Sequence, residues 1–491
     1  MDNEQEVTPP HSSDPAAVSV IGIDLTARFQ TFEGWGTSLA WWANVIGGWS
    51  EERRAEIVEK LYSAEKGLGF NIARYNIGGT KDAHDPYLHY GKAILSYQNE
   101  DGTWNWSRDA GQRAVTQHIR KMAETPIFEA FSNSPPWWMT CSYDAEREDG
   151  ADGCTTGGFD GSGNLRPGRE REFAEYLTET VKHFRDEWDI VFRTLAPFNE
   201  PAADWWKYRI AKQEGAHIGP AQQQTVIREV YEALRAKGLN DTAISASDES
   251  LVQMAFETWQ AFEPETKARI EQVNTHTYNT PDYDPRPFFE AVSADGKKLW
   301  MSEFGFENGE HPTVDPHSMT GAQRLVQGIT RDLKIMQAEA WVYWQAVESD
   351  SSTWGLIFAP FENNESESYT MYKQYYAMAH YSRFIRPGSV IIANDGDKSL
   401  AAIDPSSRRL VIVTYNDSET EAAIYRYQLR GWNSGHPDSD SQVRVYRTTA
   451  EENLAELEPI PLEHTEFTAE TPPCSITTYV MDLPDRKAEL S

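Results

Sequence analysis

The chain has 491 residues, of which 39% are hydrophobic, so it can bury a large core and form two domains. Its 45 Lys and Arg residues are outnumbered by 76 Asp and Glu residues, and a formal net charge of −31 argues against partners such as nucleic acid or anionic membranes. This acidic balance favours a neutral or weakly charged partner. No run of 18 apolar residues occurs, so we expect no membrane span.

The first part of the chain predicts a tail, an isolated strand and three further strands. Residues 1–17 are acidic and lack the basic and apolar regions of a signal peptide. Residues 18–30, "VSVIGIDLTARFQ", predict a strand that joins a sheet formed later in the chain. The segments "FEGWGTSLAWW", "FNIARYNIGG" and "TPIFEAFSNSPPWW" predict three strands, each followed by a loop.

From about residue 170, helical and strand patterns alternate. Five strands are predicted in "DIVFRTLAPFNE", "TAISASDES", "QVNTHTYN", "KKLWMSEFG" and "EAWVYWQAVE", with four helices between them. Together with the three earlier strands they make eight, and repeated strand–helix units of that number predict a closed (β/α)8 TIM barrel of the α/β class. No GxGxxG follows the first strand, which disfavours an open dinucleotide-binding sheet.

After Pro387 the pattern changes to short strands separated by Gly, Asp, Ser and Pro. This texture predicts an antiparallel β-sandwich. We therefore expect a tail at 1–17, a sandwich strand at 18–30, a catalytic barrel at 31–386 and a fused side β-sandwich domain at 387–491.

Two glutamates end apolar barrel strands immediately before a turn. They are Glu200, at the fourth strand, and Glu303, at the seventh. Because the active site of a TIM barrel lies at the carboxyl ends of its strands, the two carboxylates should meet across one cleft. Such a pair is the equipment of glycosidic-bond cleavage, which needs one protonated and one ionised carboxyl group.

Other polar strand-end residues suit the same chemistry. Arg74 and Tyr278 are candidates for holding one carboxylate ionised, and Asn199 is suited to bind a sugar 2-hydroxyl. His276 is interpreted as a hydrogen-bonded scaffold residue. Because indole rings stack on sugar rings, tryptophans are further candidates for substrate binding. They are Trp35, Trp138, Trp205 and Trp344.

The segments "FEGWGTSLAWW", "RYNIGG", "SNSPPWWM", "APFNEP", "SEFG" and "SRFIRPGS" resemble glycoside hydrolase family 30, in order and over nearly the whole chain. The resemblance implies a retaining enzyme, with Glu200 as acid/base and Glu303 as nucleophile. It also implies that Arg74, Asn199, Tyr278 and Trp344 line the subsite next to the scissile bond, and Trp138 matches the tryptophan of the family's Ser-Pro-Pro-x-Trp-Met motif.

"GWGTSLAWWA", "APFNEP" and "KQEGAHI" are similar to the endo-β-1,6-galactanase branch of the family, which implies cleavage of the β-1,6-galactan side chains of arabinogalactans. The match departs at Ala216, where a cysteine is expected, and in the segment from Cys141 to Cys154. A β-1,6-glucanase or a xylanase of the same family stays an alternative, as does a non-catalytic carbohydrate-binding protein, although the latter should have lost one glutamate.

The remaining expectations concern cofactors, partners and location. With neither a CxxC pair nor an HExxH run, we expect no metal and no cofactor. We expect a polysaccharide or oligosaccharide as the partner, no nucleic acid, no membrane, and a monomer. Cys141 and Cys154 are either a disulfide or two free thiols. Secretion is expected from the substrate class alone.

Overall fold

Eight parallel strands close into a barrel, which confirms the predicted (β/α)8 fold. The computed structural model describes residues 18–142, 153–159, 163–278, 283–305, 317–349, 354–361, 366–432 and 441–483. The barrel strands are, in order around the ring, β2 (Gly34–Ser38), β3 (Ile72–Asn76), β4 (Ile127–Phe131), β5 (Phe192–Ala196), β6 (Ala243–Glu249), β7 (Ile270–His276), β8 (Lys298–Phe304) and β9 (Ala340–Gln345). All their carboxyl ends therefore meet at one mouth.

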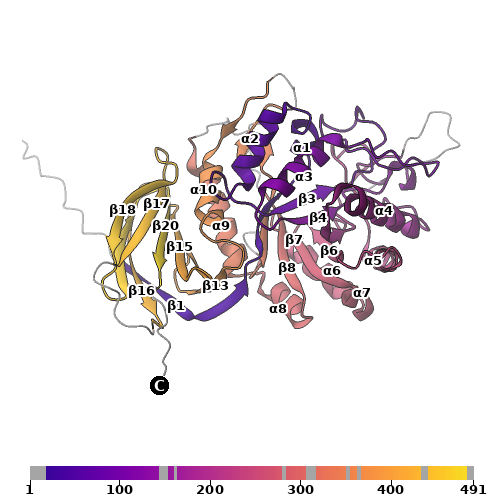
Figure 1. The fold of residues 1–491 in the computed structure, drawn as a ribbon. Coiled ribbons are helices and arrows are strands. Elements are labelled where there is room, and N and C mark those ends of the chain that lie inside the picture. Colours follow the sequence, from indigo (N-terminus) through magenta and orange to yellow (C-terminus); the bar gives the residue numbers. More distant parts are fainter. Residues whose placement is uncertain are drawn as a thin grey trace, which may run out of the picture.

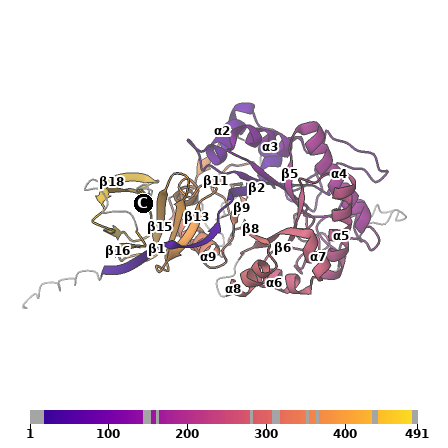
Figure 2. The same ribbon diagram turned by 60° about the horizontal axis from the view of Figure 1, so that its bottom comes forward.

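Helices surround the strands, as the end-on view in Figure 2 shows. They are α1 (Trp42–Ile46), α2 (Glu51–Tyr62), α3 (Ala110–Met122), the 3-10 turn η1 (Trp137–Met139), α4 (Glu170–Trp188), α5 (Pro220–Ala236), α6 (Val252–Ala261), α7 (Pro264–Arg269), α8 (Arg286–Ala294), α9 (Met319–Lys334) and α10 (Lys373–Ser382).

Helices also follow the first two barrel strands, where the sequence patterns predicted only loops. Ser50 caps α2 by accepting a hydrogen bond from the backbone N–H of Arg53. Ile57, Val58 and Leu61 form its buried face. The helical spacing of these residues and the serine before them were present in the sequence as signals for α2.

The second domain is one nine-stranded sheet that folds over its own core. Its strands are β1 (Val18–Thr31), β13 (Val390–Asn394), β14 (Ser399–Asp404), β15 (Arg409–Asn416), β16 (Ala423–Arg430), β17 (Gln442–Thr448), β18 (Ala455–Pro461), β19 (Glu466–Thr471) and β20 (Ser475–Asp482). The stacked rings of Tyr427 and Phe467, in β16 and β19, pack on Tyr479 of β20, so strands distant in the sheet share one core. This is the expected side β-sandwich.

The sequence patterns did not predict the two edge strands of this sheet, β18 and β19. Edge strands carry many exposed polar side chains and tolerate proline, so their hydrophobic alternation is weak. Inside the sheet, β1 pairs antiparallel with β13 and parallel with β16. The first described strand thus lies within a sheet formed by the end of the chain.

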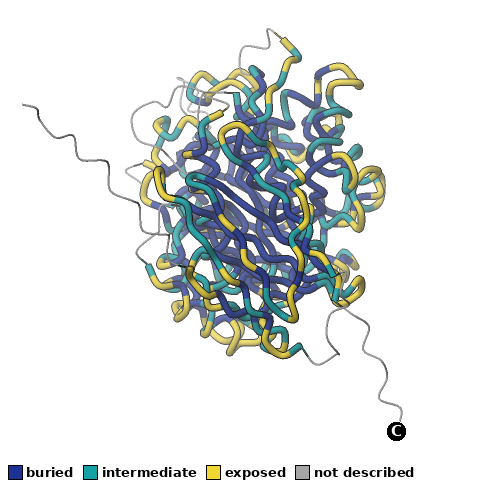
Figure 3. Tube along the Cα trace, turned by 90° about the vertical axis from the view of Figure 1, so that its left-hand side faces the viewer, coloured by how far each residue is buried: buried dark blue, intermediate teal, exposed yellow. Residues whose placement is uncertain are grey.

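Helices α9 and α10 lie between this sheet and the barrel (Figure 1). From α10, the buried His380 ring meets Thr448 and Thr478 of the sheet at 2.8 and 2.7 Å. Figure 3, which looks onto the outer face of the sheet, shows buried chain in the centre of the molecule and most of the exposed chain toward its rim. The domain bounds proposed from the sequence stay a prediction, and the tail at 1–17 lies outside the described residues.

Three short strands stand beside the barrel mouth in a separate sheet: β10 (Val347–Glu348), β11 (Ile357–Phe358) and β12 (Thr370–Met371). Cys141 and Cys154 are free thiols, so they form no disulfide with each other. Within the part of the chain that the structure describes, none of the helices combines the length and the apolarity needed to cross a membrane.

Candidate active site

The interior of the barrel changes from apolar to charged toward the mouth. Near the amino ends of the strands, the inward side chains of Ile72, Trp300, Ala340 and Val342 pack together. Strand residues two positions apart face the same side, so Arg74 stands one layer above Ile72. There Arg74 is fully buried, with the ring of Phe131 4.3 Å from its guanidinium carbon.

Arg74 binds three carboxylates at once. Its Nε donates to Glu129 over 2.8 Å, Nη1 donates to Glu303 over 2.6 Å, and Nη2 donates to Asp248 over 2.5 Å. Burial alone would lower the pKa of Arg74, but the three anions raise it above its ordinary value. The guanidinium is therefore a permanent cation whose fork fixes the position of Glu303.

Glu129 and Asp248 were not nominated from the sequence. Glu129, in β4, also accepts hydrogen bonds from Thr194, Ser245, Gln272 and Asn274, so it ties the three strands β5, β6 and β7 to Arg74. Asp248 accepts one from Ser302 over 2.6 Å. Burial by itself would raise the pKa of Asp248, but Arg74 and His276 hold it below its ordinary value. The strand end "ASDES" carried a signal for Asp248, because it too ends in acidic residues.

Irregularities in two strands coincide with the acidic residues of the site. The pairing of β6 with β7 shifts register between Ser247 and Glu249, and Asp248 there has a φ of 67°. The pairing of β8 with β9 shifts between Met301 and Phe304, on either side of Glu303. Such bulges re-aim side chains, which explains how Asp248 and Glu303 both reach Arg74.

The Glu303 carboxylate lies close to hydrogen-bonding groups of three residues. Besides Arg74, its carboxylate accepts a hydrogen bond from the hydroxyl of Tyr278 over 3.1 Å and lies 3.3 Å from Nδ1 of His276. Burial raises the pKa of Glu303 to about 7, although His276 and Arg74 act in the opposite direction. Burial therefore disfavours the ionised form of Glu303, and the two neighbouring cations and the Tyr278 hydroxyl favour it.

Glu200 occupies a strained turn directly after β5. Its φ of 48° lies in the left-handed region that non-glycine residues seldom adopt. Its backbone N–H donates to the carbonyl of Asp248 over 2.8 Å, and its own carbonyl accepts from the indole of Trp206 over 2.9 Å. These contacts stabilise the turn of Glu200, a residue that is only 7% exposed.

His276 joins the two glutamates. Its Nδ1 lies 3.1 Å from Glu200 Oε1. Its Nε2 lies 3.2 Å from Asp248 Oδ1, which is close enough for an ion pair, but the angle does not suit a hydrogen bond. Burial alone would lower the pKa of His276, but Glu303 and Asp248 raise it to about 10. The three carboxyl groups of Glu200, Glu303 and Asp248 around the ring therefore favour its protonated form.

The distance between the glutamates follows from this bridge. One oxygen of Glu200, one oxygen of Glu303 and a ring nitrogen of His276 lie within 4.8 Å of one another. The sequence interpretation of His276 as scaffold therefore missed its contact with both candidate catalytic groups. Its place at the end of β7 was the only signal.

Aromatic rings form an apolar wall beside the carboxylates. Trp344 meets Trp41 edge to face at 5.9 Å, and both pack with Tyr278 and Trp354. Gly305 allows this arrangement, because a Cβ there would come within 2.1 Å of the Trp354 ring. Trp41 and Trp354 are further candidates that the sequence analysis did not select.

The other predicted binding residues have different surroundings. Asn199 is buried, and its Oδ1 has no hydrogen-bond partner among the described residues. Trp205 is 42% exposed and packs on Trp206, whose indole contacts Glu200. Trp138 is buried in η1 against Trp137 and Tyr176.

The nomination of Trp35 is wrong. Trp35 is fully buried, its indole donates to the carbonyl of Ile385 over 2.7 Å, and its ring packs against Trp341 and Tyr381. Its position in β2 has the parity of outward-facing residues, so the side chain points at the surrounding helices and away from the barrel interior.

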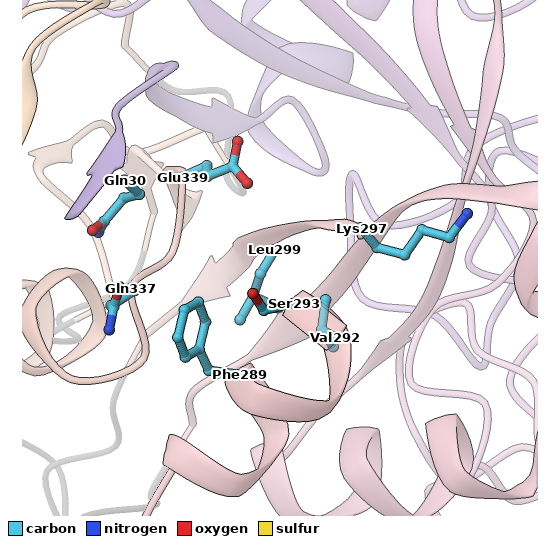
Figure 4. Close-up of a pocket in the computed structure, with 8 residues that line it drawn as sticks. All are labelled: Gln30, Phe289, Val292, Ser293, Lys297, Leu299, Gln337 and Glu339. Atoms are coloured by element: carbon cyan, nitrogen blue, oxygen red, sulfur yellow. The ribbon is translucent and has the colours of Figure 1, made fainter. Parts of the chain in front are cut away.

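A cavity of about 210 Å³ opens at the opposite end of the barrel (Figure 4). Leu299 and Glu339, which lie near the starts of β8 and β9, line it. Because Glu303 lies at the other end of β8, this cavity is separate from the carboxylate pair.

The chain is similar in sequence to known glycoside hydrolases. The model of O-glycosyl hydrolase family 30 matches residues 18–283. An endo-β-1,6-galactanase of Hypocrea rufa is 31% identical over 82% of this chain and 81% of that protein. An exo-β-1,6-galactobiohydrolase of Bifidobacterium longum subsp. longum is 25% identical over 83% of this chain but only 34% of its own length.

Solved structures show the same architecture. A conserved exported protein from Bacteroides fragilis superposes with a TM-score of 0.78 at 22% identity, covering 94% of this chain and 100% of that one. This likeness concerns the fold.

Proposed function

The chain belongs to glycoside hydrolase family 30, and from this premise we propose that it cleaves β-1,6-galactan by double displacement with retention of configuration. It is an O-glycosyl hydrolase, which removes the alternative of a non-catalytic carbohydrate-binding protein. The similarity to a β-1,6-galactanase over most of both chains supports galactan as the substrate.

The observation that carries the mechanism is the closeness of Glu200 and Glu303. An oxygen of each lies within 4.8 Å of the other. Retaining glycosidases hold their carboxyl groups about 5–5.5 Å apart, whereas inverting ones need about 6.5–9.5 Å to admit a water. The short separation supports direct attack by one carboxylate.

The hydrogen bonds support a division of roles. Glu303 faces two cations and a hydroxyl donor, which stabilise its ionised form, whereas Glu200 accepts a side-chain hydrogen bond only from His276 in the described part of the chain. We therefore assign the role of nucleophile to Glu303 and the role of acid/base to Glu200.

In the first step, Glu303 attacks the anomeric carbon, the glycosidic bond breaks, and Glu200 gives its proton to the leaving oxygen. In the second step, water attacks the same carbon, Glu200 takes its proton, and Glu303 leaves. Arg74 and Tyr278 keep the Glu303 carboxylate in place through both steps. Asn199, with its unpaired Oδ1, is proposed to accept a hydrogen bond from the sugar 2-hydroxyl.

Further binding roles are proposed for Trp344, in the wall beside Tyr278, and for the exposed Trp205. Trp138 stays a candidate for substrate binding, a role that requires the substrate to reach its buried ring from the cleft. We propose that the protein acts as a monomer. A polymeric substrate supports action outside the cell.

The test is product release from three polymers: β-1,6-galactan stripped of arabinose, β-1,6-glucan and glucuronoxylan. Glu303→Gln serves as the blank. We expect galacto-oligosaccharides from the first polymer alone, with the β-anomer as the initial product by NMR. Products from glucan or xylan alone would contradict the substrate, and initial release of the α-anomer would contradict the retaining mechanism.

A further inference from the structure

Asn133 is a buried side chain whose polar atoms are unused. It lies just after β4 and is 1% exposed. Neither its Oδ1 nor its Nδ2 has a hydrogen-bond partner among the described residues. Burying an amide without partners is unfavourable, so the Asn133 side chain offers two hydrogen-bonding groups that a bound ligand can satisfy.

The position of Asn133 follows from β4. Glu129 and Phe131 both contact Arg74 and therefore face the barrel interior. Asn133 stands two positions beyond Phe131, at a bend where the chain leaves the carboxyl end of β4. The backbone N–H of the intervening Ser132 donates to the carbonyl of Ala196, the last residue of β5, so Asn133 lies at the barrel mouth beside the strand end that precedes Asn199 and Glu200.

The backbone of Asn133 is held in place although its side chain is unpaired. Its N–H donates to Asn76 Oδ1 over 3.3 Å, and Asn76 Nδ2 donates to the buried Glu214 over 2.9 Å. Glu214 also accepts hydrogen bonds from the backbone N–H groups of Gly79 and Thr80. The unused amide is therefore part of an ordered site.

The ligand must offer a donor and an acceptor side by side, because both halves of the amide are free. Two neighbouring hydroxyls of a sugar ring meet this requirement. In the proposed reaction, the groups on β5 to β8 surround the anomeric carbon, and Asn199 is assigned to the 2-hydroxyl. The remaining neighbouring ring hydroxyls are those at C3 and C4.

We propose that Asn133 binds the 3- and 4-hydroxyls of the sugar whose glycosidic bond is cleaved, with Oδ1 accepting from one and Nδ2 donating to the other. This inference rests on the proposed function and names a residue that determines specificity. The 4-hydroxyl is axial in galactose and equatorial in glucose, so a fixed amide that contacts it distinguishes the two sugars.

The experiment compares Asn133→Ala with Asn76→Ala on three substrates. These are the 4-nitrophenyl glycoside of β-1,6-galactobiose and its analogues deoxygenated at C3 or at C4 of the nitrophenyl-bearing galactose. For Asn133→Ala we expect kcat/KM on the parent to fall on the order of 30-fold, the effect of two lost hydrogen bonds. On the deoxy substrates the loss should shrink to about fivefold, since one of the two bonds is already missing.

Thermal stability separates binding from structure. Removing an unpaired buried amide should leave Tm unchanged or raise it, whereas Asn76→Ala breaks hydrogen bonds to Glu214 and Asn133 and should lower Tm. A lower Tm for Asn133→Ala, with equal losses on all three substrates, would overturn the proposal, as would no loss at all. A wild type that cleaves only glucan would instead overturn the proposed substrate, and Asn133→Ala would then be compared on 3- and 4-deoxy glucosides.

Discussion

Arg74 and Glu303 are joined by a hydrogen bond of 2.6 Å between Nη1 and Oε1, although β3 and β8 are not neighbours in the barrel. The same guanidinium binds Glu129 and Asp248, so a single cation holds the proposed nucleophile against the rest of the site. The barrel mouth is therefore organised by one buried charge, and its replacement should affect both stability and catalysis.

Arg74→Lys should lower the free energy of unfolding by about 3 kcal/mol, because an ammonium cannot reproduce the planar fork that binds three buried carboxylates. Urea denaturation measures the change, and kcat/KM should fall in parallel. Arg193→Lys is the matched control, since Arg193 pairs with Glu33 at a partly exposed site. We expect that variant to change stability by no more than about 1 kcal/mol. Equal effects of the two replacements would contradict the role of Arg74.

Glu303→Gln should lower kcat by about 10⁴-fold or more, because an amide cannot attack the anomeric carbon. The variant should stay folded, since the amide oxygen can still accept the hydrogen bond from Arg74. Steady-state hydrolysis and circular dichroism test the two statements together. A folded variant with kcat near that of the wild type would remove Glu303 from the nucleophile role.

The Glu200→Ala variant should lose more activity on a substrate with a more basic leaving group. Galactan, whose leaving group needs a proton, should be cleaved at least ~10²-fold more slowly, because general acid catalysis contributes on that scale. A dinitrophenyl galactoside needs no proton and should still form the glycosyl-enzyme, which a burst of dinitrophenolate would reveal. Equal losses on both substrates would argue against an acid role.

His276→Gln should move the acid limb of the kcat/KM profile to higher pH. Burial raises the pKa of Glu303 to about 7, and the His276 imidazolium lowers it from the value that burial alone would impose. Removing this cation disfavours the carboxylate, so the midpoint should rise by about one pH unit. His183→Asn, on α4 with its ring stacked on Trp106, is the control and should leave the midpoint unchanged. An unmoved midpoint in His276→Gln would contradict the charge assigned to this ring.

Glu249→Gln should change how stability depends on pH. Burial raises the pKa of Glu249 from 4.5 to about 7, so the folded state binds its proton more tightly than the unfolded state does. The stability contributed by this protonation is present below pH 4.5 and is lost as pH rises through about 7, a change of roughly 3 kcal/mol. The glutamine keeps the hydrogen bond from the N–H of Ala202 and does not titrate.

The test is the free energy of unfolding of the wild type and of Glu249→Gln, each measured at pH 5 and pH 8. Relative to wild type, Glu249→Gln should be more stable at pH 8 than at pH 5. A difference between the two proteins that does not vary with pH would mean that Glu249 is ionised in the folded state throughout.

Local sequence determined the strands, most of the helices and the two glutamates, because each depends on the residues beside it. Glu200 and Glu303 could be selected since each ends an apolar strand before a turn, and the barrel fold brings such ends to one mouth. The edge strands β18 and β19 were missed, since exposed strands lack the apolar alternation that marks buried ones.

Tertiary structure decided which strand residues face the cleft and what charge they carry. Trp35 looked suited to bind a sugar, but the parity of its position in β2 turns it outward. Asp248 and Glu303 reach Arg74 where the strand register shifts, and such shifts depend on the pairing of strands far apart in the chain. The raised pKa of His276 and the unpaired amide of Asn133 likewise depend on neighbours from several strands, because burial and hydrogen bonding exist only after the barrel closes.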